Sequence, residues 1–211
     1  MSQHDPSTSS LGPVGLSRGP ARLLAYVDES MRELPDSTTK CYFLAAAVIP
    51  EPACDLIRDT LRPLLLGREP RLHWTREADP RKELITKTIS QAQVESVVLV
   101  GAMLHRNRQE RARSQVLKHL LWELDRMNVS HVVLESRGPT PDRRDLTVIG
   151  GLRNSQHVSR RLAVSHGQPI QEPLLWIPDA VAGAAGDQRC GNPNHYQTLG
   201  PRVRLIDVGS V

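Results

Sequence analysis

The chain has 211 residues, with 27 Lys and Arg against 23 Asp and Glu, a net charge of +4 and a pI of about 9.2. This length allows one domain with its own core, and the basic balance is compatible with a polyanionic partner without requiring one. The three Cys residues are too widely spaced for a paired zinc motif and favour reduced thiols in a cytoplasmic protein. No apolar run approaches the ~20 residues of a membrane span, so no membrane partner is expected.

The N-terminal residues 1–20 are rich in Ser, Pro and Gly and show no hydrophobic periodicity, which predicts a disordered leader. Residues 21–199 are expected to form the domain. Residues 200–211 are expected to be a C-terminal tail or a short strand.

The domain is predicted to open on a hairpin. The apolar run 23–27 indicates a buried strand that stops at Asp28 and Glu29, and a second buried run follows at 41–49. No helix separates the two runs, so they should pair antiparallel.

Later segments alternate between helical and strand patterns. Apolar spacing and terminal signals predict helices at 52–66, 80–91, 116–127 and 173–185, and one that starts with Thr140 as N-cap and Pro141 as first residue. Continuous or alternating apolar runs predict strands at 95–104, 131–136 and 158–164. This order of elements is typical of an α/β fold with a mixed sheet.

Carboxylates follow two strands of this predicted sheet. A helix precedes the strand that ends at Glu135, so it can lie parallel to the first strand, which brings Glu135 and Asp28 to one sheet edge. Asp179, in the late helix, can pack across that edge. Three converging carboxylates repel one another unless a cation neutralises them, and oxygen ligands suit Mg²⁺ or Mn²⁺. A pair of such ions ~3.5–4 Å apart is a known arrangement for phosphodiester cleavage.

Several segments resemble one bacterial family. The motifs Tyr26–Ser30 and Tyr42–Ile49, the pair His73-Trp74, and Pro173–Ala184 with its Asp-Ala-Val-Ala-Gly are similar to the domain of unknown function 3800, a family regarded as ribonuclease H-like. The resemblance covers residues 22–199. It implies a mixed five-stranded sheet with an N-terminal antiparallel hairpin, helices on both faces and a carboxylate site. Met31 stands where the family commonly has Gly after Asp-Glu-Ser.

The resemblance also assigns residues to the site. Asp28, Glu135 and Asp179 match the family's acidic positions and are the candidate catalytic residues and metal ligands. Ribonuclease H enzymes use a further glutamate, whose counterpart stays open here. The alternatives for this fourth carboxylate are Glu29, Asp142 and Asp145, and Asp145 is favoured because it is expected to lie near the Glu135 edge.

Other polar residues are candidates for support or substrate contact. They are Glu29, Ser30, His73, Arg137 and Arg153. Each has a plainer interpretation: strand alternation points Glu29 to the opposite face from Asp28, and a single His is weak evidence for catalysis. Likewise Asp28 could accept only backbone N–H bonds, and Asp179 could act only on the helix dipole. The arginines at 106, 108, 111 and 113 either contact phosphates or form a solvated helix start.

The pattern as a whole predicts a nuclease or other phosphodiesterase that depends on Mg²⁺ or Mn²⁺ and acts on nucleic acid. The alternative is a non-catalytic ribonuclease H-like module that binds nucleic acid or a protein partner. An enzyme acting on a small phosphate is a third, weaker possibility, and the chain has no G-x-x-x-x-G-K-[ST] phosphate loop. RNA or DNA as substrate, endo or exo action and oligomeric state stay open.

Overall fold

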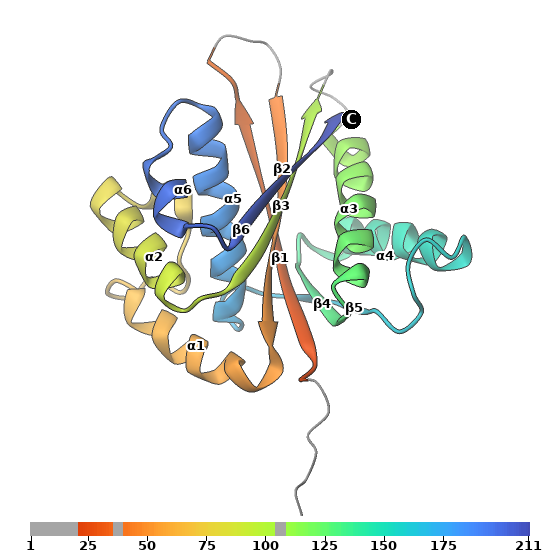
Figure 1. Ribbon diagram of the computed structural model, residues 1–211, viewed down its shortest axis with the longest axis horizontal. Coiled ribbons are helices and arrows are strands. Elements are labelled where there is room, and N and C mark those ends of the chain that lie inside the picture. The colour runs from red at the N-terminus through yellow and green to blue at the C-terminus, as the bar shows by residue number, and fades with distance from the viewer. Residues whose placement is uncertain (1–20, 36–39, 104–108) are drawn as a thin grey trace, which may run out of the picture.

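A six-stranded mixed sheet forms the centre of the molecule, with helices on both faces (Figure 1). The computed structural model describes residues 21–35, 40–103 and 109–211. The strand order is β5-β4-β1-β2-β3-β6. The strands are β1 (Leu23–Glu33), β2 (Lys40–Pro50), β3 (Glu95–Met103), β4 (Val129–Glu135), β5 (Ala163–Gly167) and β6 (Val203–Ser210).

The α/β class, the antiparallel hairpin of β1 with β2 and the helices on both faces are confirmed. The predicted count of five strands is wrong by one. The segment predicted as a tail or a short strand forms β6, which pairs parallel with β3 and so extends the sheet. The predicted leader, residues 1–20, lies outside the described residues.

Each face of the sheet is covered by its own helices and has its own apolar core. One face, here called the α5 face, carries α1 (Cys54–Leu61), α2 (Asp79–Gln91), α5 (Trp176–Arg189) and α6 (Asn194–Leu199). The other, the α3 face, carries α3 (Gln109–Arg126) and α4 (Pro139–Asn154). Figure 1 shows the two groups on opposite sides of the strands. No described helix is both long and apolar enough to cross a membrane.

Strand β1 continues past the acidic residues at which the sequence predicted its end. It pairs with β2 as far as Glu33 opposite Lys40, so the hairpin ladder holds the polar half of the strand in place. Tyr26 packs in the core of the α5 face, and Val27 packs in the core of the α3 face. Side chains alternate along a strand, so Asp28 belongs to the α5 face and Glu29 to the α3 face.

Strand β4 pairs parallel with β1, as the sequence predicted, and ends beside Asp28. The final register pair of the two strands joins Val27 to Leu134, and Glu135 is the last residue of β4. Val133 packs against the core of the α5 face, and alternation therefore places Glu135 on that face as well. Asp28 and Glu135 are thus neighbours on one face, at the point where β4 stops.

Several predicted element boundaries are wrong, among them the start of α3, which is at Gln109 and not near residue 116. Helix α4 was predicted to start with Thr140 as N-cap, but it begins at Pro139 with Gly138 as N-cap. The N-cap residue has a φ of 104°, a backbone angle that glycine adopts readily and other residues rarely do. Strand β5 begins five residues later than predicted, at Ala163. The predicted helix 52–66 is α-helical only at Cys54–Leu61, and Pro63 lies in a 3₁₀ turn after it.

Candidate functional site

Three carboxylates gather on the α5 face. Asp28 and Glu135 come from the adjacent strands β1 and β4, and Asp179 comes from the first turn of α5, which packs on β1. We call these three residues the acid cluster. Burial raises the pKa of Asp28 well above its ordinary value of 3.8, the charges of Asp179 and Glu135 raise it further, and Arg71 acts in the opposite direction. Hydrogen bonding with the side chain of Glu135 acts in the same direction and favours the protonated form of Asp28.

Asp179 ties a distant part of the chain to the acid cluster. Its Oδ2 accepts a hydrogen bond of 2.9 Å from the backbone N–H of Trp74 and lies 3.4 Å from Nδ1 of His73. The carboxylate therefore does more than complement the dipole of α5. The side chain of His73 is 31% exposed, so it borders both the acid cluster and solvent.

The position of Trp74 explains the spacing of the late motif. A Cβ added to Gly183 would lie 2.1 Å from Cδ1 of Trp74, so the indole can rest on α5 only where the helix has glycine. The indole Nε1 donates to Asp187 at 2.9 Å, one turn further along the helix. Asp179, Gly183 and Asp187 thus form a stripe with four-residue spacing that seats the segment containing His73 and Trp74.

A cation that the sequence analysis missed lies within the acid cluster. Nη1 of Arg71 donates to Oε1 of Glu135 at 2.9 Å, and the side chain of Arg71 is 32% exposed. His73 has extended backbone angles, with φ −146° and ψ 110°. Residues two apart in an extended chain point to the same side, so the side chains of Arg71 and His73 are expected to lie together. This spacing is the sequence feature that could have identified Arg71 as a site residue. Both residues also line a hollow of about 420 Å³ together with Arg76.

A different arrangement of charges lies on the α3 face. Arg113 is 3% exposed and donates to both oxygens of Asp145, at 3.0 and 2.7 Å. It also contacts Glu29, which accepts a hydrogen bond from the hydroxyl of Tyr42. Burial alone would raise the pKa of Asp145, but the hydrogen bonds and charge of Arg113, followed by the charge of Arg137, outweigh it and lower the pKa. We call these five residues the paired network.

None of the alternatives for a fourth carboxylate joins the acid cluster. Glu29 and Asp145 belong to the paired network. Asp142 accepts hydrogen bonds from the hydroxyl of Ser136 at 2.6 Å and from the backbone N–H of Arg137 at 2.9 Å, and so holds the turn before α4.

The remaining candidates are also dispersed. Arg137 donates to Glu110 at 2.7 Å and lies 3.4 Å from Asp145, and Arg153 donates to the backbone carbonyl of Leu162 at 2.6 Å. Neither is brought to the acid cluster. Ser30 accepts a hydrogen bond of 3.0 Å from Arg32.

The expectation of a solvated or phosphate-binding arginine run is wrong for Arg113, which is buried in the paired network. Arg111 is exposed. Arg106 and Arg108 lie outside the described residues.

The acid cluster fits a hard divalent cation in its donor chemistry. Its donors are carboxylate oxygens, and the raised pKa of Asp28 shows that these neighbouring carboxylates lack enough positive charge around them. As arranged, no group of three or more His, Cys, Asp or Glu side chains among residues 21–35, 40–103 and 109–211 could hold a metal ion. The carboxylates would therefore have to draw closer around an ion.

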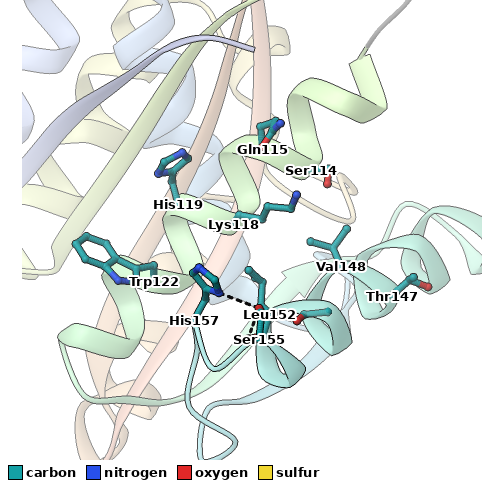
Figure 2. Close-up of a pocket in the computed structure, with 11 residues that line it drawn as sticks. Ser114, Gln115, Lys118, His119, Trp122, Thr147, Val148, Leu152, Ser155 and His157 are labelled. Atoms are coloured by element: carbon teal, nitrogen blue, oxygen red, sulfur yellow. Dashed lines mark hydrogen bonds between the residues drawn. The ribbon is translucent and has the colours of Figure 1, made fainter.

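A larger hollow lies between α3 and α4, on the α3 face (Figure 2). Its volume is about 760 Å³, and its lining includes Lys118, Trp122 and Leu152 but no acidic residue. Figure 2 shows His157 beside this hollow, where its Nδ1 is 2.8 Å from the hydroxyl of Ser155. This hollow shares no residue with the acid cluster.

Comparisons with known proteins do not identify a function for this chain. No family model matches the chain, and no curated protein matches it. Among solved structures, the chain is similar to one from the complex of PCNA with RNase HII of Archaeoglobus fulgidus, with 14% identity and a TM-score of 0.49 over 83% of this chain and 77% of that chain.

Proposed function

We propose that this protein is a nuclease that depends on Mg²⁺ or Mn²⁺ and hydrolyses phosphodiester bonds of nucleic acid. The observation that carries the proposal is the acid cluster. Two carboxylates on adjacent parallel strands and a third from the helix above them meet on one face, and the pKa of Asp28 is raised by burial and by the other two. Carboxylates that repel one another in this way are typical of sites that take up a cation.

Asp28, Glu135 and Asp179 are the residues that would hold the ion. When bound there, a divalent ion activates water and stabilises the leaving oxygen of a phosphodiester. Arg71, beside Glu135, supplies N–H groups for a phosphate oxygen. His73 lies beside Asp179 with part of its ring exposed, which suits the transfer of a proton to or from the substrate.

The basic chain supports nucleic acid as the substrate, since 27 Lys and Arg exceed 23 Asp and Glu. The free thiols at positions 41, 54 and 190 are compatible with a reducing cytoplasm, and they support our proposal of a cytoplasmic location.

Cleavage of labelled RNA and DNA, each single- and double-stranded, in the presence of Mn²⁺ tests the proposal. We expect at least one of these substrates to be cut, EDTA to stop the reaction, and Asp28→Asn to lower the rate by at least about 100-fold. Asp59→Asn is the matched control, because Asp59 pairs only with Arg62 in an exposed i, i+3 contact among the described residues. Cleavage that survives Asp28→Asn unchanged contradicts the proposal.

A non-catalytic module that binds nucleic acid is the second candidate. It is favoured by the pairing of Arg71 with Glu135, which neutralises part of the acid cluster without a metal. This alternative predicts no heat of Mn²⁺ binding, and an affinity for nucleic acid that falls steeply with salt. A protein partner in place of nucleic acid would give a shallow salt dependence.

A further inference from the structure

We propose that Arg71 takes the position of a second metal ion, so that the acid cluster binds one divalent ion rather than a pair. This inference rests on the proposed function, because it concerns the metal that the acid cluster would hold. It begins from the contact between Nη1 of Arg71 and Oε1 of Glu135, at 2.9 Å.

The charges in the acid cluster support a single ion. Asp28, Glu135 and Asp179 contribute three negative charges when all are ionised, and Arg71 contributes one positive charge. Two negative charges are left, which one divalent ion balances. A second ion would give the site a net charge of +2, against +1 if Arg71 were absent, and none of the alternatives Glu29, Asp142 or Asp145 lies in the acid cluster to offset it.

The position of Arg71 also leaves little room for a second ion beside Glu135. Paired ions in phosphodiester-cleaving sites lie ~3.5–4 Å apart, so a second ion would have to fit close to the first among the same carboxylates. Glu135 ends its strand beside Asp28, but one of its oxygens already accepts the guanidinium. A second ion could reach Glu135 only through its other oxygen, where it would lie close to the like charge of the guanidinium.

Arg71 differs from a plain structural ion pair because it also reaches the neighbouring hollow. It lines this space of about 420 Å³ with His73 and Arg76, and its side chain is 32% exposed. A guanidinium has five N–H donors, so the donors that do not bond to Glu135 can bind a phosphate oxygen that enters from the hollow. Arg71 would then do for the phosphate what a second ion does in a two-metal site.

The number of bound ions tests the inference without any measurement of cleavage. Calorimetric titration of the full chain with Mn²⁺ gives the stoichiometry, and electron paramagnetic resonance at saturation reveals whether two Mn²⁺ ions are spin-coupled. We expect one uncoupled ion for the wild type. We expect the same for Arg71→Lys, which keeps the charge, and for Arg76→Ala, which alters an exposed residue of the same hollow.

Removal of the charge should change the count. Arg71→Ala should admit a second ion and give a spin-coupled pair. Two ions in the wild type, or a single ion in folded Arg71→Ala, would overturn the inference and leave the proposed nuclease standing. Two ions in the wild type would overturn the inference even if Arg71→Ala fails to fold. No binding of Mn²⁺ to the wild type would instead remove the proposed function itself.

Discussion

Asp28 and Glu29 are consecutive residues of β1, yet their carboxylates have opposite surroundings. Glu29 belongs to the paired network, where Arg113 contacts both Glu29 and Asp145. Asp28 belongs to the acid cluster, where burial and the two other carboxylates raise its pKa. The paired network balances its charges with protein side chains, so it stabilises the fold. The acid cluster leaves negative charge unbalanced, which is the condition expected of a site built for a ligand.

The largest effect should come from breaking the paired network. Arg113→Ala would remove the buried cation that contacts Glu29 and Asp145 most closely and leave them with the more distant Arg137, and the loss of one partner of a buried ion pair costs about 3–5 kcal/mol. Denaturant unfolding should show a loss of this size. A loss below about 1 kcal/mol would mean that the paired network does not stabilise the fold.

A smaller loss is expected where α5 holds the segment with Trp74. Gly183→Ala forces a methyl group against the indole, and overpacking of this kind costs about 1–3 kcal/mol. Gly150→Ala is the matched control, because it is also a helical glycine but a Cβ there has no neighbour within 4 Å. The control should stabilise the protein by up to about 1 kcal/mol. Equal effects of the two substitutions would contradict the proposed fit between Trp74 and α5.

Asp28→Asn should raise stability, in contrast to Arg113→Ala, and should do so in a pH-dependent way. Without metal, the folded protein holds the Asp28 proton more tightly than the unfolded chain does, because the pKa is raised above 3.8 on folding. Stability of the wild type therefore falls as pH rises from about that value through the raised pKa. Asn does not titrate, so the advantage of the variant should grow over the same range.

Unfolding of both proteins in EDTA, at pH 4 and at pH 8, measures this difference. An advantage of Asp28→Asn that stays constant or shrinks with rising pH would show that Asp28 is not protonated in the folded protein.

The smallest effect is expected in the hollow between α3 and α4. Lys118 is exposed there and belongs to neither charged cluster. Lys118→Ala should change the free energy of unfolding by less than about 0.5 kcal/mol and leave Mn²⁺ binding unaltered. Weaker Mn²⁺ binding by this variant would indicate that the ion binds on the α3 face and not in the acid cluster.

Much of the arrangement can be read from local patterns in the sequence. Two apolar runs without a helix between them predict the hairpin, and a helix before the third run predicts that β4 lies parallel to β1. These two inferences suffice to bring Asp28 and Glu135 to one place, because alternation along strands is a strict geometric rule.

Other features depend on contacts that no local pattern records. Arg71 and Glu135 are 64 residues apart, and Arg113 and Asp145 are 32 residues apart. The favoured fourth carboxylate, Asp145, followed Glu135 closely in sequence, but the packing of α4 against α3 turns it toward the opposite face. The length of β1 was underestimated because the pairing with β2, rather than its own apolar residues, keeps its polar half in the sheet.

Anomalous X-ray scattering from crystals soaked in Mn²⁺ locates any bound ion. We expect one anomalous peak within coordination distance of the carboxylates of Asp28, Glu135 and Asp179, and none in the paired network. A crystal that shows no ion at Asp28, or an ion on the α3 face, would rule out the acid cluster as the metal site.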